Sequence, residues 1–528
     1  MLTLHGYRIP KDHRELALKK ALTVKPFSFV NPMAVPRYTV YHEDRQWLYL
    51  PKHFGLERYG PVSTLRDVAQ TADSQWSFAG SIRPAQLPVV NSFLLPEPHD
   101  GIISLHTGGG KTVCALYIAS RLRVPTLVIV HNTFLRDQWV DRIRGFLPKA
   151  RIGVRNEDMS CDTFIRDFTI RVEDDVIKYK KGESTPNFKL LKNIKEDELV
   201  ALAHIIGADS TLDSVTSAIP KYTSIRDVTI GMLQGIVQKK VNVSEFASIG
   251  LVIVDECHHI ASEVFVQALP KVTSRYMLGL SATPERKDKL MFAIHWFLGP
   301  LLYKSDTGDS VDTAINVEMY EYENDDPEFN EIVVSSQGMV SVPIMVNKLA
   351  ACEDRTRWLA RILADVIEDG RQVLVLSDRV QHCKDILEAL PEDLKERACI
   401  LSQAVKSDVR TEYCRTKVIL IATYSMCKEG FDVPTLNTLV MATPRPDIDQ
   451  IVGRILRVEK AGRKVHPLIV DIVDPQFKRQ FGARNTLYKK RQYRVTKMLM
   501  PSSAAQQPSV ASMLLAGTGA RTHEEEDS

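Results

Sequence analysis

The sequence predicts an α/β protein with two parallel β-sheet domains, flanked by a small N-terminal α+β module and a basic helical extension after the second domain. Short runs rich in β-branched residues recur through the middle of the chain, and turn residues and a helical segment follow each run. Strands that alternate with helices in this way are typical of βαβ units. The runs are almost wholly apolar and do not alternate, which indicates parallel strands buried on both faces.

The apolar runs form two clusters, at residues 81–300 and 346–475, and we interpret each cluster as one domain. A chain of 528 residues is long enough for more than one domain of roughly 100–200 residues. We expect strands at residues 101–105, 126–130, 251–255 and 276–281 in the first domain and at 372–376, 417–422, 438–442 and 468–472 in the second.

Three further segments surround or interrupt the first domain. Residues 1–80 contain an aromatic-rich stretch with alternation, which predicts the N-terminal module. Residues 154–226 are polar and mixed in charge, which favours an insertion or an extended loop. Residues 301–345 contain an acidic stretch and are expected to connect the two domains, with some local strand structure. We expect the aromatic side chains of the N-terminal module to lie in its core: Tyr38, Tyr41, Trp47, Tyr49 and Phe54.

The end of the chain divides into a basic stretch and a polar tail. A basic helical extension is expected over residues 476–500, and it could bind phosphates or be a solvated basic face without a partner. Residues 501–528 are rich in Ser, Ala, Gln and Gly and are predicted to be disordered, because they cannot bury enough apolar surface. The eight basic residues of the extension are Lys478, Arg479, Arg484, Lys489, Lys490, Arg491, Arg494 and Lys497.

Composition alone decides little about partners. Lys and Arg total 68 and Asp and Glu total 65, so the net charge is only +3. This balance neither requires nor excludes nucleic acid, and local patches must decide. The eight cysteines lack the spacing of a zinc knuckle. No apolar stretch is long enough for a signal peptide or a membrane span, so no membrane partner is expected.

A glycine-rich turn links the predicted strand at 101–105 to the next helix. It reads HTGGGKT over residues 106–112. Three glycines let backbone N–H groups converge on one anion, and the start of the helix adds its dipole. Lys111 can then reach the β- and γ-phosphates of a nucleotide, and the Thr112 hydroxyl can bind Mg²⁺. Leu105 stands where the general phosphate-loop pattern has its first glycine, so a chance GKT in a strand-to-helix turn stays the alternative.

Two carboxylates, Asp255 and Glu256, lie at the end of the predicted strand at 251–255. Charged residues at this edge of a parallel sheet lie where open α/β sheets bind ligands. We expect Asp255 to hold Mg²⁺ through water and Glu256 to orient or deprotonate the attacking water. The alternative is that Asp255 only caps the next helix. No zinc site is expected at Cys257 and the two histidines after it, because adjacent helical residues point apart.

Taken in chain order, these and further motifs resemble those of the superfamily 2 helicases over residues 81–475. The resemblance implies two tandem RecA-like domains that hydrolyse ATP with Mg²⁺ in the cleft between them and bind nucleic acid. Its motifs are SIRPAQ at 81–86, the loop at 107–112, VIVHNTFLRDQW at 128–139, TIGMLQ at 229–234, DECH at 255–258, SAT at 281–283, residues 371–378, ATYSMCKEGFD at 422–432 and QIVGRILR at 450–457.

The resemblance also implies a role for each matching residue. The catalytic set is Lys111, Asp255, Glu256, Gln450, Arg454 and Arg457. The nucleotide-binding set is Gln86, Thr107, Gly108, Gly109, Gly110, Lys111, Thr112 and Asp432, with Mg²⁺ held by Thr112 and by Asp255 through water. Coupling and nucleic-acid contact fall to Thr229, Ser281, Ala282, Thr283 and Thr423. Because Arg454 and Arg457 are three residues apart, we expect both on one helix face, where they can act as arginine fingers.

More narrowly, the chain resembles the xeroderma pigmentosum group B-like branch and the transcript-release-type helicases of poxviruses and other large cytoplasmic DNA viruses. The supporting segments are YLPKHFGLERYG at 49–60, DECHHIASEVF at 255–265, LGLSATPERKD at 278–288 and IDQIVGRILR at 448–457. Lys287 departs from the Arg-Glu-Asp element of the group B helicases, which puts the strand-separating role of that element in doubt.

This narrower resemblance implies an ATP-dependent DNA helicase or translocase acting in transcription or DNA repair. DNA is favoured over RNA as partner, with the transcription machinery as a further partner. An intracellular location follows, in the cytoplasm or virion if the viral resemblance holds and otherwise in the nucleus. Two alternatives stay open: an RNA helicase, and a motor subunit that moves along duplex without unwinding it. The paired domains and the motif at 450–457 argue against a third, a phosphate-loop ATPase unrelated to nucleic acid.

Overall fold

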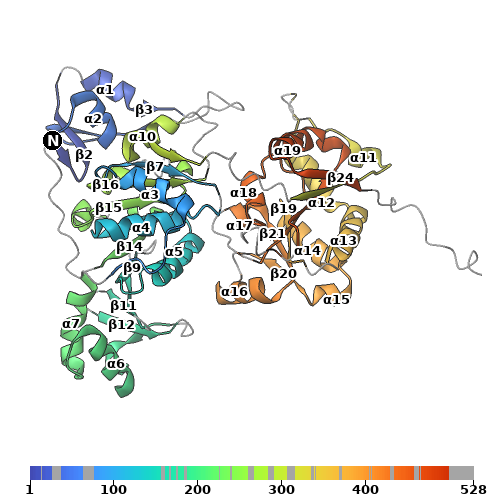
Figure 1. Cartoon of the computed structure of the whole chain (residues 1–528). Helices are drawn as coiled ribbons and strands as arrows, with labels where there is room; N and C mark the ends of the chain where they lie inside the picture. The colour runs from blue at the N-terminus through green and yellow to red at the C-terminus, as the bar shows by residue number, and fades with distance from the viewer. Residues whose placement is uncertain are drawn as a thin grey trace, which may run out of the picture. The chain divides into compact units, whose positions relative to one another are not determined.

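The computed structural model divides the chain into two compact units, Met1–Thr307 and Gly308–Ser528. Each unit contains a parallel sheet packed against helices, so the predicted fold class is confirmed (Figure 1). The structure describes residues 1–498 except for 13–14, 26–36, 63–75, 107, 156–160, 166–167, 174–175, 183–186, 225, 238–240, 260–266, 283–289, 306–314, 335–337, 339, 368–370, 403–404, 406, 429–432, 434, 457–462 and 464.

The first unit is built on a sheet whose central strands run parallel. In order across the sheet these are β9 (Ile152–Arg155), β14 (Val228–Met232), β8 (Thr126–Val130), β15 (Leu251–Val254), β16 (Tyr276–Ser281), β7 (Gly101–Ser104) and β17 (Leu301–Lys304). Helix α3 (Leu87–Leu94) precedes β7, and helices between the strands include α4 (Lys111–Leu122), α5 (Thr133–Phe146), α8 (Leu233–Val237) and α10 (Met291–Leu298).

Strand β8 shows why the apolar runs do not alternate. Leu127 and Ile129 belong to the hydrophobic core on one face of the sheet, with side chains of α8 and α10. Val128 and Val130 belong to the core on the other face, with side chains of α3, α4 and α5. Both faces are covered, so every position in the strand is buried and apolar residues are favoured throughout.

The segment between β9 and β14 is a folded insertion and not an extended loop. Ile170, Tyr179 and Leu202 lie in a hydrophobic core of its own. Its antiparallel strands lengthen the first sheet beyond β9, and two helices follow them. These elements are β10 (Cys161–Ile165), β11 (Phe168–Glu173), β12 (Val176–Lys181), β13 (Lys189–Leu190), α6 (Glu196–Ile206) and α7 (Leu212–Ser224).

The N-terminal module packs against the first sheet domain through its second helix. Lys52 and His53 begin this helix, and both side chains contact Asp100, at 2.5 Å and 2.8 Å from its Oδ2 atom. Asp100 directly precedes β7. The module contains β1 (Leu2–Thr3), β2 (Gly6–Pro10), α1 (Glu15–Ala21), β3 (Thr23–Val24), β4 (Tyr38–Thr39), β5 (His42–Glu43), β6 (Trp47–Leu50) and α2 (Lys52–Tyr59).

The aromatic side chains of this module do not all lie in its core. Tyr38 is buried, as expected. Trp47 and Tyr49 are only half-buried, because Leu48 and Leu50 occupy the inward positions of β6 and successive strand residues face opposite sides. Prediction from composition missed this, since aromatic content does not say which face of a strand points inward.

The second unit contains one parallel sheet. Its strands, in order, are β20 (Ala398–Leu401), β21 (Ile419–Thr423), β19 (Val373–Ser377), β22 (Thr438–Met441), β23 (Leu468–Val473), β18 (Asn316–Glu321) and β24 (Arg494–Met498). Its helices are α11 (Pro327–Asn330), α12 (Val342–Ala351), α13 (Glu353–Ile367), α14 (Val380–Ala389), α15 (Glu392–Lys395), α16 (Ser407–Thr416), α17 (Tyr424–Lys428), α18 (Asp449–Val452) and α19 (Lys478–Lys490).

Two segments expected outside the sheet domains contribute strands to them. Within the expected connector, 301–345, β17 pairs with β7 in the first unit and β18 pairs with β23 in the second. The basic extension is helical only in α19, because β24 follows it and pairs in parallel with β18 at the sheet edge. None of the described helices is long and apolar enough to cross a membrane.

Candidate functional site

The glycine-rich turn follows β7 and leads directly into α4. Gly108 and Gly110 have φ angles of 88° and 85°, in the left-handed region that side chains disfavour. A Cβ atom at Gly110 would lie 2.1 Å from Nε2 of Gln86, so a side chain would collide there. Gly110 must therefore be glycine for both backbone and packing reasons. Thr107 lies outside the described residues.

Gln86 holds this loop from the side. It ends the short 3-10 helix η1 (Pro84–Gln86) and is buried. Its Oε1 accepts a hydrogen bond from the Arg83 backbone N–H at 3.1 Å, and its Nε2 donates to the Gly109 carbonyl at 3.3 Å. The amide is therefore fixed between its own turn and the glycine-rich loop.

Lys111 and Thr112 occupy the first turn of α4, and both are half-buried. The Lys111 ammonium donates to the Leu105 carbonyl at 3.3 Å and lies 3.6 Å from Oε1 of Glu256. This places the cation between the glycine-rich loop and the carboxylate pair, which the sequence separates by more than a hundred residues. A long flexible lysine side chain in this position can turn toward a phosphate bound in the loop.

Asp255 follows β15 directly and is only 5% exposed. Its Oδ2 accepts a hydrogen bond from the indole Nε1 of Trp139 at 2.8 Å, and its Oδ1 accepts one from the Glu256 backbone N–H at 2.9 Å. Burial and the neighbouring Glu256 charge raise the pKa of the Asp255 carboxyl, while the Trp139 hydrogen bond and the Lys111 charge act in the opposite direction. Both oxygens are held by protein donors, so the orientation of the carboxylate is fixed.

Glu256 has an unusual backbone conformation, with φ at 46°. A non-glycine residue in the left-handed region costs about 1–2 kcal/mol, and such strain concentrates at functional sites. The Oε2 atom of Glu256 lies 3.2 Å from Nδ1 of His258, and the same nitrogen lies 3.1 Å from Oγ of Ser281. A continuous polar path therefore joins the carboxylate pair to the end of β16, where Ala282 follows Ser281. Thr283 lies outside the described residues.

The oxygen ligands available here suit a magnesium ion bound together with a nucleotide. Mg²⁺ prefers oxygen, and in nucleotide sites it keeps waters and takes only one or two protein ligands beside the phosphates. The Thr112 hydroxyl and the Asp255 carboxylate fit that requirement. Among the described residues, no group of three or more His, Cys, Asp or Glu side chains could hold a metal ion by itself.

The expected arginine pair is only partly described. Helix α18 (Asp449–Val452) ends one residue before Gly453, and residues 453–456 form a turn. The prediction that a helix face presents Arg454 together with Arg457 is therefore wrong, since Gly453 disfavours the helix and Arg454 lies beyond it. Arg454 is 7% exposed. Gln450 lies within α18, whereas Arg457 and Asp432 fall outside the described residues.

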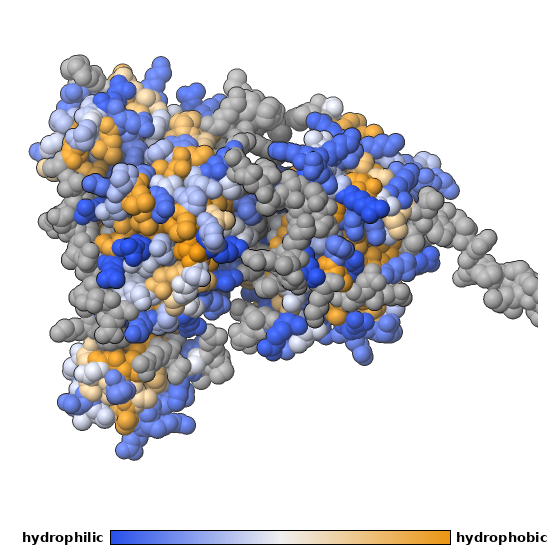
Figure 2. Space-filling view, viewed as in Figure 1, coloured by the Kyte–Doolittle hydropathy of each residue, from blue (hydrophilic) through white to orange (hydrophobic). Residues whose placement is uncertain are grey.

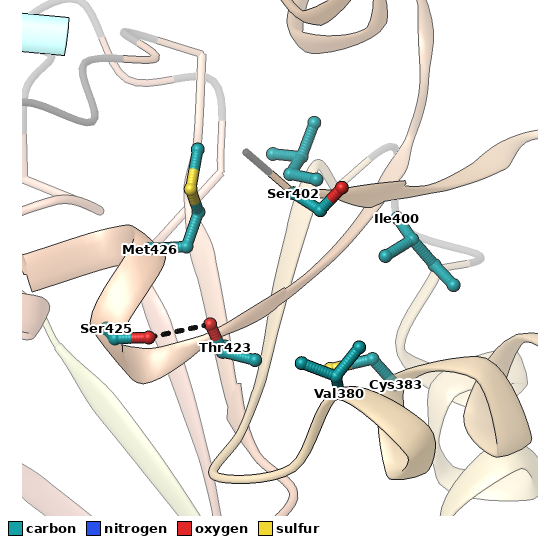
Figure 3. A pocket seen from close by; sticks show the side chains of 8 residues that line it. Val380, Cys383, Ile400, Ser402, Thr423, Ser425 and Met426 are labelled. Carbon is teal, nitrogen blue, oxygen red and sulfur yellow. Dashed lines mark hydrogen bonds between the residues drawn. The ribbon is translucent and has the colours of Figure 1, made fainter. Parts of the chain in front are cut away.

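Thr229 and Thr423, two of the expected nucleic-acid contacts, both lie on strands: Thr229 near the start of β14 and Thr423 at the end of β21. Thr229 is half-buried in β14, and Thr423 ends β21 with its hydroxyl 3.0 Å from that of Ser425. These two hydroxyls lie at a hollow at the carboxyl ends of β20 and β21 (Figure 3). The volume of this hollow is about 270 Å³. The hollow is lined by Val380, Cys383, Ile400, Leu401, Ser402, Thr423, Ser425 and Met426.

Trp139 is a site residue that sequence reasoning missed. The sequence places it in the motif at 128–139, and nothing in that motif points to Asp255, 116 residues away. Strand β8 pairs with β15 in the sheet, and α5, which contains Trp139, follows β8. Trp139 could be placed beside Asp255 only if this pairing of strands were known. His258 was expected within the motif at 255–258, but no link from it to Ser281 was predicted.

The first unit matches a known protein family. Residues 79–286 match the family described as "Type III restriction enzyme, res subunit". This stretch includes Gln86, the glycine-rich loop, the carboxylate pair and Ser281, so the match covers the whole of the site described in the first unit.

Curated relatives match over most of the chain. The "Putative ATP-dependent RNA helicase L396" of Acanthamoeba polyphaga mimivirus is 24% identical, over 96% of this chain and 88% of its own length. The "Putative ATP-dependent RNA helicase QP509L" of African swine fever virus, strain Badajoz 1971 Vero-adapted, is 24% identical over 93% and 89%. The "Probable helicase D10" of Escherichia phage T5 is 23% identical over 78% and 76%.

Solved structures with similar chains include T4 UvsW and Mss116p bound to ssRNA and AMP-PNP. UvsW is 16% identical with a TM-score of 0.31, and the match covers 92% of this chain and 96% of that one. Mss116p is 14% identical with a TM-score of 0.47, over 82% and 75%.

The site and its relatives define an enzyme that hydrolyses ATP in dependence on nucleic acid. The relatives that match it over most of their length carry the printed names of helicases, from mimivirus, African swine fever virus and phage T5, which supports a helicase activity.

Proposed function

We propose that the chain is an ATP-dependent DNA helicase or translocase that acts in transcription or DNA repair. The observation on which this rests is the arrangement of Lys111, Asp255 and Glu256 around the glycine-rich loop, with a polar path from Glu256 to Ser281. A path of this kind couples the state of the nucleotide to an element that touches the nucleic acid, which is what a motor requires.

The first unit binds the nucleotide and prepares the attacking water. Backbone N–H groups of the loop at 107–112 and the start of α4 hold the phosphates, and Lys111 contacts the β- and γ-phosphates. Thr112 directly, and Asp255 through water, hold Mg²⁺, which neutralises charge on the β- and γ-phosphate oxygens. Glu256 accepts a hydrogen bond from the attacking water and takes its proton as the bond to phosphorus forms.

Residues outside this centre complete the ATP site in the proposal. Gln86 contacts the adenine from its position beside the loop, and Asp432 contributes to nucleotide binding. Arg454 and Arg457, with Gln450, come from the second unit and stabilise the negative charge that develops on the γ-phosphate in the transition state. These assignments rest on the resemblance, and for Gln86 also on its contact with Gly109.

Coupling to the nucleic acid runs through the ends of strands. Ser281, Ala282 and Thr283 respond to Glu256 through His258, and Thr229 and Thr423 contact the sugar-phosphate backbone. The hydroxyls of Thr423 and Ser425 at the hollow of Figure 3 support this role, since they can donate to phosphate oxygens. Contacts of this type do not read sequence.

Trp139→Phe tests the hydrogen bond that orients Asp255. The change keeps an aromatic ring in the core but removes the donor, and a hydrogen bond to a charged group is worth about 1.5–3 kcal/mol. We expect the Mg²⁺ concentration for half-maximal ATP turnover to rise several-fold, and the preference for MgADP over ADP in a fluorescent-nucleotide binding assay to fall. Trp76→Phe is the matched control, because Trp76 is buried in the same hydrophobic core. Equal Mg²⁺ responses in the two variants would refute the orienting role.

Steady-state ATPase rates show which nucleic acid stimulates the enzyme. The protein is assayed alone and with single-stranded DNA, duplex DNA, forked DNA and RNA, using Lys111→Ala as the blank. We expect at least a tenfold stimulation by DNA and little by RNA. An unwinding assay on the forked substrate then separates a helicase from a motor that only moves along duplex. Basal hydrolysis without stimulation by any of the four would contradict the proposal.

An RNA helicase is the second candidate. The printed names of the mimivirus and African swine fever virus relatives, which describe ATP-dependent RNA helicases, favour it. The ATP site is the same in both cases, because ATP hydrolysis does not involve the sugar of the nucleic acid, whereas contacts to the 2′-hydroxyl could distinguish the two strands. Stimulation by RNA and not by DNA in the same assay would establish it.

A further inference from the structure

Helix α19 has two chemically different sides. Arg484 and Tyr488 point into the second unit and are 1% and 0% exposed. Lys478, Arg479, Lys489 and Lys490, by contrast, are exposed at the two ends of the helix. The basic residues of this stretch, which look alike in the sequence, are thus divided by the fold into an anchoring group and a free group.

Arg484 and Tyr488, the anchoring group, fix α19 to buried residues of the second unit near the segment that contains Arg454. Arg484 forms an ion pair with Asp471, with Nη2 at 2.8 Å from Oδ1, and its Nη1 donates to the Arg445 carbonyl at 2.9 Å. The Tyr488 hydroxyl donates to Oδ2 of the same Asp471 at 2.8 Å. Because these partners are buried, breaking one of them would leave an uncompensated charge, and the geometry is strongly fixed.

A second anchor reaches α18 itself. Nη2 of Arg491, which caps the end of α19, lies 2.9 Å and 3.0 Å from the two carboxylate oxygens of Asp449, the first residue of α18. Tyr488 shares a hydrophobic core with Ile451 and Ile455, on either side of Arg454. The position of α19 therefore determines the position of the segment that contains Arg454.

The free group forms a basic surface. Within the described part of the chain, Lys478, Arg479, Lys489 and Lys490 take part in no ion pair, whereas Arg491 and Lys497 nearby each pair with a carboxylate. No acidic residue occurs from 475 to 498. Figure 2 shows strongly hydrophilic side chains gathered over α19.

The shape of this surface suits an extended polyanion. From Lys478 to Lys490 the helix covers roughly 18 Å, which corresponds to about five nucleotides of one strand at the rise of B-form DNA. Gly482 and Ala483 are exposed between the two basic ends, and a Cβ atom at Gly482 would meet nothing within 4 Å. Because these two side chains are small, a nucleic-acid backbone can lie along the helix and contact the basic residues at both of its ends.

We propose that the outer side of α19 binds the phosphates of the nucleic acid, and that its inner side transmits this contact to the segment of Arg454. The inference rests on the proposed function, since it assumes that the chain acts on nucleic acid. Helix α19 would both contact the nucleic acid and position the segment of Arg454. Binding of a nucleic-acid strand would then favour the conformation in which the arginines act on ATP.

The contact is tested by a quadruple variant, Lys478→Gln, Arg479→Gln, Lys489→Gln and Lys490→Gln. Binding of a fluorescein-labelled single-stranded DNA is followed by anisotropy at several salt concentrations. Loss of four phosphate contacts should flatten the slope of log Kd against log salt by about 3, and weaken binding at least tenfold at low salt. The matched control removes the same charge from exposed positions elsewhere in the second unit: Arg361, Lys384, Arg397 and Arg415, each changed to Gln.

The transmission is tested at the Arg491–Asp449 pair. Arg491→Gln should lower the maximal DNA-stimulated turnover at least fivefold while the DNA affinity stays within about twofold of the parent. Arg491→Lys keeps one charge-assisted contact and should recover part of the turnover, a result that a purely structural lesion would not produce.

The outcomes separate this inference from the proposed function. A parent protein that binds neither DNA nor RNA would overturn the proposed function itself. A parent that binds, with a quadruple variant that keeps the affinity and salt slope of the control variant, would overturn only the role of α19. Equal loss of affinity and turnover in Arg491→Gln would overturn the transmission.

Discussion

Glu256→Gln should stop ATP turnover while ATP still binds. Glutamine has the same size and can adopt the same left-handed backbone at φ 46°, so the change removes the charge and leaves the strain. It also removes the group that takes the proton of the attacking water in our proposal. General-base contributions are typically about 10²–10⁴-fold, and we expect a loss of that size in single-turnover hydrolysis.

Nucleotide affinity should change little in this variant, or even increase. Lys111 lies 3.6 Å from Glu256, and without the negative charge its ammonium is free to pair with phosphate alone. A fluorescent ATP analogue measures the affinity, and circular dichroism checks the fold. Glu245→Gln is the control, because Glu245 is an exposed acid in the same unit. Turnover within threefold of the parent would remove Glu256 from the catalytic role.

Lys111→Ala should instead abolish binding and turnover together. In our proposal the ammonium makes two charge-assisted hydrogen bonds to phosphate, each worth about 1.5–3 kcal/mol. Their loss corresponds to ATP binding weaker by about 10²-fold or more. Alanine also removes the positive charge that lies beside Glu256 and Asp255, so the two carboxylates would oppose the binding of the ATP phosphates more strongly.

The two variants are most informative when compared. Equilibrium binding of ATP and single-turnover hydrolysis are measured for each, with Lys149→Ala, an exposed lysine of the same unit, as the control for lost charge. Binding retained with hydrolysis lost in Glu256→Gln, and both lost in Lys111→Ala, is the expected pattern. If Lys111→Ala bound ATP as tightly as the control, the loop at 107–112 would not be the phosphate site.

Local patterns were enough to predict many of the buried parallel strands. The expected runs at 126–130 and 276–281 coincide with β8 and β16, and the others differ from their strands by one or two residues at one or both ends. Buried parallel strands must be apolar at every position, and that requirement is visible in the sequence alone. Strands β17 and β24 at the sheet edges, and β18 beside β24, were not among the expected runs because their partly exposed positions break the apolar pattern; β9, β14 and β20 were not among them either.

The site divides in the same way. The sequence predicted that Lys111, Asp255 and Glu256 belong to one site, because a phosphate loop and a metal-holding carboxylate need fixed residue types beside a strand, and Lys111 lies 3.6 Å from Glu256 in the structure. The hydrogen bond from Trp139 to Asp255 was not, since it joins residues 116 positions apart and depends on how α5 packs over the sheet. The helix expected to present Arg454 with Arg457 also failed, because the periodicity of a motif does not reveal that α18 stops at Val452.

The sequence by itself determined the class of this protein: two apolar parallel sheets, a phosphate loop and a carboxylate pair are each written in short stretches of neighbouring residues. Only the tertiary structure decided which basic residues of α19 are free and which are anchors, and which indole orients Asp255. Those choices depend on burial and on pairs of atoms from distant segments. Side chains of the same type are indistinguishable along the chain until packing gives each a different neighbour.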